Sequence, residues 1–266
     1  MNDLNPQQRE AVRHIDGPLL VLAGAGSGKT RVITRKIAYL IEQCGIPARH
    51  IAAVTFTNKA AREMKTRVAE LMSSRQNASA RGLMVSTFHT LGLNILRREY
   101  QHLGYRSGFS IFDAQDSLAV LRDLMGRDFA ADSDHAEKVQ WHISEWKNQM
   151  ILPDKAMQIA EAGTPQSAAR VYPHYVEALK AYNAVDFDDL ILKPVLLFRE
   201  HREVLKKWQA RIHYLLVDEY QDTNGCQYEL VKQLVGIREA FTVVGDDDQS
   251  VYSWRGARPE NLAQLQ

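Results

Sequence analysis

The stretch from Pro18 to Thr30 constrains this chain more than any other part of the sequence. It begins as a short apolar run, breaks into glycines and ends in Lys29 and Thr30. In a phosphate-binding loop, glycines let backbone N–H groups converge on phosphate oxygens, a lysine reaches the terminal phosphates, and a hydroxyl on the first helical turn ligates magnesium. The stretch therefore predicts a strand, a phosphate-binding loop and a helix.

The usual template of such a loop begins with glycine, whereas this one begins with Ala23. A glycine-rich turn with a surface lysine is the competing interpretation. The context favours the phosphate site, because the preceding run is typical of a buried strand and apolar residues recur at helical spacing from Arg31 to Gln43. The loop residues predicted to bind phosphate are Ala23, Gly24, Ala25, Gly26, Ser27, Gly28, Lys29 and Thr30.

Length and composition limit the class of protein. The chain has 266 residues, 45% of them hydrophobic, which is enough for one large or two ordinary domains. No apolar run reaches the length of a membrane span, and the N-terminus lacks the layout of a secretory signal, so we expect a soluble, cytoplasmic protein. Cys44 and Cys226 have no metal-ligand spacing and are expected to be reduced thiols. With a net charge of +1, any contact with nucleic acid must come from local patches and stacking.

Two further strand–helix units follow the loop. The first is a strand at 51–56 with a helix to about residue 71, and the second a strand at 83–86 with a helix to about residue 100. Strands that alternate with helices predict an α/β fold with a parallel sheet covered by helices on both faces. Ligands of such sheets bind at the carboxyl ends of strands. Phe56 and Phe88 are predicted at such ends, where core packing and a stacking platform are both open interpretations.

The character of the chain changes between about residues 100 and 200. Apolar residues recur at helical intervals there, without clear strand-like alternation, which predicts an all-helical insertion. Glycines and prolines divide it into several helices. The acidic stretch from Asp186 to Leu190 could suggest a metal site, but a solvated helix N-terminus is the favoured interpretation, since helix starts favour acidic residues.

A second apolar strand, at 212–217, runs directly into Asp218 and Glu219. A phosphate-loop ATPase needs one strand-end aspartate to hold magnesium and a neighbouring carboxylate to orient or deprotonate the attacking water. Asp218 fits the first role and Glu219 the second. An ordinary acidic loop after a strand is the alternative.

A last strand, at 241–245, precedes three aspartates, to which we assign helix capping and positioning. Gln249 is placed to touch a terminal phosphate. Tyr252 and Trp254 could stack on bases while Arg255 takes a phosphate, although a packed aromatic corner with an exposed arginine is also open.

Seven stretches, in this order along the chain, resemble the N-terminal motif series of the superfamily 1A (UvrD/Rep-type) DNA helicases. They are Leu4 to Val12, Ala23 to Thr30, Thr55 to Ala61, Ser86 to His89, Asp186 to Leu190, Leu215 to Asn224 and Val244 to Ala257. The resemblance implies a RecA-like P-loop parallel sheet formed by residues 1–85 plus 200–266, interrupted by an all-helical insertion domain at 86–199.

The resemblance also implies roles for individual residues, with ATP and Mg²⁺ as cofactors. Gln8 would read the adenine and Arg31 would lie beside the base. Lys29, Asp218, Glu219 and Gln249 would form the catalytic set, and Thr30 and Asp218 would hold the metal. The single-stranded DNA path would be lined by Phe56, Thr57, Asn58, His89, Phe187, Tyr252, Trp254 and Arg255.

Members of this family have further C-terminal helicase domains, called 2A and 2B, of which 2A, a second RecA-like domain, supplies arginines to the nucleotide site. The sequence stops before such a domain, so we expect a piece of a longer 3′ to 5′ helicase. We expect this piece to bind nucleotide and single-stranded DNA weakly, and neither to hydrolyse ATP fast nor to unwind duplex. Expected partners are single-stranded DNA, its junctions with duplex, and replication or repair proteins. The motifs do not separate fork restart, repair and plasmid maintenance. A P-loop small-molecule kinase or other phosphotransferase and a non-catalytic nucleic-acid-binding module remain the alternatives.

Overall fold

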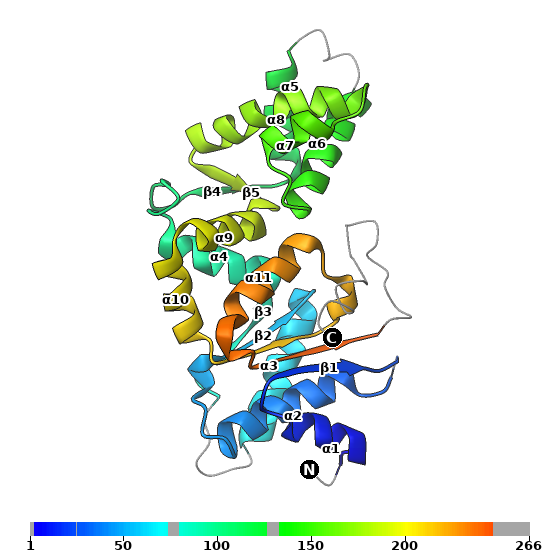
Figure 1. Cartoon of the computed structure of the whole chain (residues 1–266), viewed down its shortest axis with the longest axis vertical. Coiled ribbons are helices and arrows are strands. Elements are labelled where there is room, and N and C mark those ends of the chain that lie inside the picture. Colours follow the sequence, from blue (N-terminus) through cyan, green and yellow to red (C-terminus); the bar gives the residue numbers. More distant parts are fainter. Residues whose placement is uncertain (1–2, 25, 74–79, 127–132, 247–266) are drawn as a thin grey trace.

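The structure is a computed structural model that describes residues 3–24, 26–73, 80–126 and 133–246. A five-stranded sheet with flanking helices forms one body, and a mainly helical body lies beyond the helices at one end of it (Figure 1). No helix among the described residues is both long and apolar enough to cross a bilayer.

The five strands run parallel in the order β1-β7-β6-β2-β3. This confirms the predicted parallel α/β sheet. Because all strands point the same way, their carboxyl ends meet at one edge, where the residues that follow each strand come together. The strands are β1 (Pro18–Leu22), β2 (Ile51–Thr55), β3 (Met84–Thr87), β6 (Tyr214–Val217) and β7 (Phe241–Gly245).

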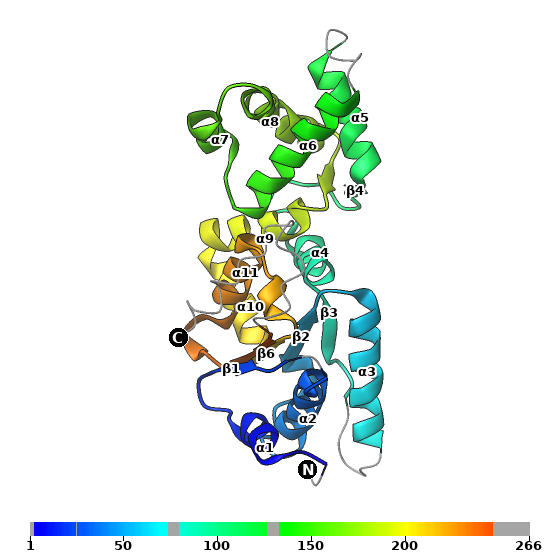
Figure 2. The same ribbon diagram turned by 90° about the vertical axis from the view of Figure 1, so that its right-hand side faces the viewer.

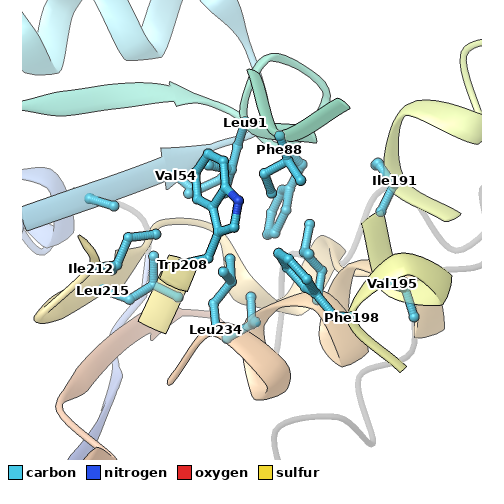
Figure 3. Close-up of a cluster of buried hydrophobic side chains, with 14 of the residues drawn as sticks. Val54, Phe88, Leu91, Ile191, Val195, Phe198, Trp208, Ile212, Leu215 and Leu234 are labelled. Atoms are coloured by element: carbon cyan, nitrogen blue, oxygen red, sulfur yellow. The ribbon is translucent and has the colours of Figure 1, made fainter. Parts of the chain in front are cut away.

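Successive residues of the inner strands face opposite sides of the sheet, as the period of two in a strand requires. In β6, Leu215 and Val217 join one core cluster, and Tyr214 and Leu216 join the other. The first cluster is covered by α4 (Phe88–Glu99), α9 (Asp189–Glu200), α10 (Arg202–Arg211) and α11 (Gly225–Val235) (Figure 3). The second is covered by α2 (Lys29–Glu42) and α3 (Asn58–Ser73), on the other side of the sheet (Figure 2).

Strand β1 lies at the edge of the sheet, which corrects the expectation that it is a buried strand. Its residues are half-buried or exposed, and Leu22 is 48% exposed. A short apolar run shows that a segment can pair in a sheet, but it does not show whether the strand has one neighbour or two.

The helical body consists of four helices packed around their own core, in which Tyr172 and Ile143 are buried. They are α5 (Ala114–Met125), α6 (Ser133–Asn148), α7 (Pro153–Ile159) and α8 (Thr164–Ala181). The region is not all-helical, since β4 (Ser110–Phe112) pairs in parallel with β5 (Ala184–Asp186). This expectation was wrong because three-residue strands are too short to show a period in the sequence.

Helices α4 and α9 join the two bodies and pack against each other. Both contribute to the core cluster on the sheet, although both fall within the predicted insertion at 86–199. The domain boundaries therefore stay a prediction. The two helices approach closely at Gly92, where an added Cβ would overlap the carbonyl oxygen of Leu190.

The remaining elements are short or lie at the periphery. Helix α1 packs against α2 through a small apolar cluster. The bounds are α1 (Pro6–Arg13) and the 3-10 helices η1 (Ala48–His50), η2 (Tyr220–Asp222) and η3 (Gly236–Arg238).

Candidate nucleotide site and adjoining groove

The glycine loop connects β1 to α2, and two of its glycines have a positive φ. Gly28 precedes the first residue of α2 with a φ of 88°, and Gly26 has a φ of 71°. Both values lie in the left-handed region, where a side chain would add strain. The loop is tied to the neighbouring strand, because the backbone N–H of Ala23 donates to the carbonyl of Gly245 at 3.0 Å. Backbone N–H groups at the start of α2 are thus available for an anion.

Gln8 lies directly against this loop. Its Nε2 donates to the carbonyl of Ser27 at 2.8 Å, and its Oε1 accepts the backbone N–H of Asn5 at 3.0 Å as part of the capping box of α1. A Cβ at Gly28 would lie 3.0 Å from the same Nε2. Both ends of the Gln8 amide therefore have a hydrogen-bond partner within the protein.

A continuous chain of hydrogen bonds joins the loop lysine to the acidic pair. Lys29 Nζ lies 3.2 Å from Asp246 Oδ2, and both side chains are buried. The backbone N–H of Asp246 donates to Gln221 Oε1 at 3.0 Å. Gln221 Nε2 in turn donates to Glu219 Oε2 at 2.7 Å. Lys29 and Glu219 therefore belong to one site, although they are far apart in the sequence.

Asp218 is buried at the end of β6 and has an unusual protonation equilibrium. Burial and the neighbouring charge of Glu219 raise the pKa of Asp218 to about 6, against the opposing effects of a backbone hydrogen bond and of Lys29. A buried carboxylate of this kind gains most from a cation. Together with the half-buried hydroxyl of Thr30 it offers hard oxygen ligands, which suit Mg²⁺.

Glu219 has a φ of 53°, which is uncommon for a residue with a side chain. This conformation turns the chain sharply after β6, so that Asp218 and Glu219 are followed at once by η2. The backbone N–H of Asp222 donates to the carbonyl of Glu219 at 3.0 Å, which closes the turn. A strained conformation held in this way is a frequent feature of functional sites.

A groove of about 1100 Å³ opens beside this site, between the sheet and the helical body. The segments that follow β2 and β3 line one side of it, and α5, α6 and the turn after β5 line the other. The groove contains every described residue predicted to line the DNA path. These are Phe56, Thr57, Asn58, His89 and Phe187.

The aromatic residues of the groove are held in pairs. The ring of Phe187 is 53% exposed and lies 5.9 Å from the ring of His89, edge to face. Phe56 is half-buried and lies 5.6 Å from Phe88, which is fully buried in the core. Phe88 therefore serves packing, whereas Phe187, His89 and one part of Phe56 are accessible to a flat ligand.

The charge of the groove limits how nucleic acid can bind. Among the described residues, its lining contains carboxylates but no lysine or arginine. Phosphates would be repelled from such a lining, whereas bases can stack on its aromatic rings. The acidic lining residues are Asp113, Glu137, Glu145, Asp186, Asp188 and Asp222.

The acidic stretch after β5 is not a solvated helix start, so this expectation was wrong. Asp186 and Asp189 are buried and bind Lys147, with Nζ at 2.6 Å and 3.0 Å from their carboxylate oxygens. Tyr175 donates a further hydrogen bond to Asp186 at 2.9 Å. The sequence did not reveal this arrangement because Lys147 comes from another helix, 39 positions before Asp186.

Some predicted residues cannot be placed, and one residue of the site was missed. Ala25, Gln249, Tyr252, Trp254 and Arg255 lie outside the part of the chain that the structure describes. Arg31 is exposed on the first turn of α2. Asp246 was assigned only capping or positioning, yet it is the partner of Lys29. Its place directly after an apolar strand is the signal that could have indicated it.

A parallel sheet with a lysine loop and an acidic pair at one edge defines a P-loop ATPase fold of the RecA-like type. Within that class the family follows from the whole sequence: residues 4–266 match the family described as the UvrD/REP helicase N-terminal domain, and the chain belongs to this family.

Individual relatives carry the same similarity. The chain is 58% identical to the ATP-dependent DNA helicase Rep of Escherichia coli (strain K12) over 98% of this chain and 38% of that protein. It is 43% identical to the ATP-dependent DNA helicase PcrA of Bacillus subtilis (strain 168) over 98% of this chain and 35% of that protein. The chain thus spans less than half the length of the curated relatives it matches.

Proposed function

We propose that this chain is the N-terminal portion of an ATP-dependent DNA helicase that moves 3′ to 5′ along single-stranded DNA in the cytoplasm. Its family and the names of its relatives support an ATP-dependent helicase. The 3′ to 5′ polarity rests on the resemblance of the motifs. The boundaries at 1–85 plus 200–266 for the ATPase core and 86–199 for the insertion belong to the same proposal.

In the nucleotide half of the proposal, the protein binds triphosphate at the start of α2. Lys29 leaves Asp246 to contact the terminal phosphates, Gln8 and Arg31 lie beside the adenine, and Gln249 senses the last phosphate. Bound Mg²⁺, held by Thr30 and Asp218, would neutralise phosphate charge. Glu219 orients the attacking water and accepts its proton. The hydrogen bond from Gln221 uses only Glu219 Oε2, so Oε1 can accept a hydrogen bond from the water.

In the DNA half, single-stranded bases stack in the groove on Phe187, His89 and Phe56, with Thr57 and Asn58 beside them. Tyr252, Trp254 and Arg255 extend this path. Stacking accepts any base because every base has a π-face, which suits movement along arbitrary sequence. The acidic lining keeps phosphates outside the groove. Junctions between single-stranded and duplex DNA would therefore bind at the rim of the groove.

The observation that carries the proposal is the position of the segment from Glu219 to Asn224. It begins at the nucleotide site, where Glu219 is bound to Gln221, and it ends in the groove, which Asp222 and Asn224 line. An ATPase that is driven along DNA needs such proximity between the two ligands. A small-molecule kinase does not require an aromatic groove at this edge of the sheet.

The decisive measurement is ATP hydrolysis by the full-length protein with and without single-stranded DNA. We expect strong stimulation by DNA and its loss in Lys29→Ala. Domain 2A would supply the arginines that complete the site, so the present chain should turn over roughly a thousandfold more slowly. Stimulation by a small phosphate acceptor instead of DNA would favour a kinase, and full activity in Lys29→Ala would favour a non-catalytic module.

A further inference from the structure

The last two residues of α6 connect three separate parts of the chain. The side chain of Lys147 is 1% exposed and binds Asp186 and Asp189 on either side of Phe187. The next residue, Asn148, contacts the same turn and also α11. The end of this helix therefore lies between the helical body and the sheet, at the floor of the groove.

Asn148 uses both ends of its amide. Its Nδ2 donates to Asp188 Oδ1 at 3.1 Å and to the carbonyl of Ser144 at 2.9 Å. Its Oδ1 accepts from Asn224 Nδ2 at 2.7 Å. A single side chain thus bridges the residue after Phe187 to the residue that caps α11.

Asn224 is itself fixed in place. It caps α11 through a reciprocal pair of hydrogen bonds with Gln227, at 2.9 Å and 3.1 Å. The turn that leads to it from Glu219 is braced internally, since Thr223 Oγ1 donates to the carbonyl of Tyr220 at 2.7 Å. A displacement of Asn224 would therefore be transmitted to Glu219 through a short, stiff segment rather than through a loose loop.

We propose that Asn148 is a positioning residue that couples DNA in the groove to ATP hydrolysis. It does so by hydrogen bonding the turn from Asp186 to Asp189, here called the Phe187 turn, to the cap of α11. The inference rests on the proposed function and adds to it a route between the two sites. When a base stacks on Phe187, the turn from Asp186 to Asp189 moves as a unit, because its carboxylates are held by α6. Asn148 moves Asn224 through their hydrogen bond, and the segment from Glu219 to Asn224 then shifts Glu219 relative to Lys29.

The test uses the full-length protein and the variant Asn148→Asp, which places a second carboxylate against Asp188. We expect the hydrolysis rate at saturating single-stranded DNA to fall by about tenfold, within the usual range of coupling between two sites. The rate without DNA should stay unchanged, since Asn148 contacts neither the loop nor the acidic pair. Asn148→Ala, which removes the hydrogen bonds to Asp188 and Asn224 without adding charge, should give the same pattern if the first variant folds poorly.

A charge-neutral exchange provides the rescue. In the double variant Asn148→Asp with Asp188→Asn, the new asparagine at 188 can donate to the new carboxylate at 148, which can still accept from Asn224. We expect DNA stimulation to return to within about twofold of the original protein, because substitutions of two residues in direct contact are not additive and can compensate each other. Gln140→Ala is the matched control, because it removes a hydrogen bond from the same helix to the carbonyl of Ala114 and also lines the groove.

The outcomes separate this inference from the function on which it rests. If the original protein shows no stimulation by DNA, the proposed function fails. If stimulation is present and the Asn148 variants raise only the DNA concentration for half-maximal rate, Asn148 positions Phe187 without coupling, and the inference is overturned. Failure of the double variant to restore the rate also overturns the inference, because loss of the hydrogen-bonded bridge would then not explain the loss of DNA stimulation.

Discussion

Lys29 and Asp246 form a buried ion pair across two adjacent strand ends, with Nζ and Oδ2 3.2 Å apart and side chains 8% and 5% exposed. The lysine that would contact phosphate is thus held by a carboxylate of the protein. Because β1 and β7 are neighbours, each strand delivers one partner. A phosphate must replace this carboxylate, so the ion pair opposes binding and keeps the lysine in place.

The first prediction concerns this competition. Asp246→Asn removes the competing charge, and we expect the affinity for ADP, measured by calorimetry without Mg²⁺, to rise about tenfold, as the strength of charged hydrogen bonds suggests. Asp16→Asn is a charge-matched control at the opposite end of β1, where the residue is exposed. Unchanged or weaker binding in Asp246→Asn would show that the ion pair does not compete with phosphate.

The second prediction concerns the pH dependence of stability. Burial raises the pKa of Asp218 to about 6 from a value of 3.8 in the unfolded chain. Between these two pH values the carboxyl group of Asp218 is protonated in the folded chain and ionised in the unfolded chain. The stabilisation that this proton provides is fully present below pH 3.8 and is lost as the pH rises through about 6. Asp218→Asn cannot ionise, so we expect it to raise the free energy of unfolding by on the order of 2 kcal/mol at pH 8 and by little at pH 4. Urea unfolding at both pH values measures the difference, and equal effects would contradict the shifted pKa.

The third prediction concerns stacking in the groove. Phe187→Ala should weaken binding of single-stranded DNA by about tenfold, since one base–aromatic stack contributes roughly 1–3 kcal/mol. The loss should be similar for oligonucleotides of thymine and of adenine, because stacking is tolerant of sequence. Tyr182→Ala is the matched control. This tyrosine is 60% exposed and, like Phe187, lies close to β5 in the sequence, but it does not line the groove. Fluorescence anisotropy with labelled oligonucleotides gives the comparison, and equal losses in both variants would argue against a specific platform.

The fourth prediction concerns Lys147, the buried lysine that binds Asp186 and Asp189. Lys147→Met leaves Asp186 and Asp189 without the cation that both contact, and we expect a loss of about 3–5 kcal/mol in the free energy of unfolding at neutral pH. The loss should shrink as the pH falls, because protonated carboxyl groups need no cation. Lys155→Met changes an exposed lysine of α7 and should cost little. A pH-independent loss would show that packing, not charge, accounts for the effect.

The fifth prediction concerns the contact between the two helices that connect the bodies. Gly92→Ala places a Cβ where the carbonyl oxygen of Leu190 lies, so α4 and α9 must separate. We expect destabilisation of about 1–3 kcal/mol, typical of overpacking, and a weaker affinity for DNA, because His89 lies in the first turn of α4 and Phe187 lies just before α9. Gly225→Ala, in the first turn of α11, where the added Cβ would make only an ordinary van der Waals contact at 3.6 Å, separates the steric overlap from the loss of a helical glycine. A stable variant with normal DNA affinity would show that the helices can shift without disturbing the groove.

Most of the sheet could be predicted from the sequence. Each strand of the sheet is an apolar run followed by a helix or by polar residues, and its end is marked by residues such as Gly24 or Asp218. The short strands β4 and β5 could not be predicted, because three residues do not establish a period. The burial of Asp186 and Asp189 was missed for another reason: a buried carboxylate needs a cation, and Lys147 lies in a different helix.

The sequence by itself determined the parts of the site that are local. A loop such as that before Lys29 requires closely spaced glycines, here at 24, 26 and 28. A pair such as Asp218 and Glu219 follows its strand directly, so both patterns are visible along the chain. Only the tertiary structure decided which residues meet. Strand order placed Asp246 beside Lys29, and the packing of α6 placed Asn148 between the Phe187 turn and α11. The physical reason is that hydrogen bonds and ion pairs act over a few ångströms in space, whatever the distance between their partners in the chain.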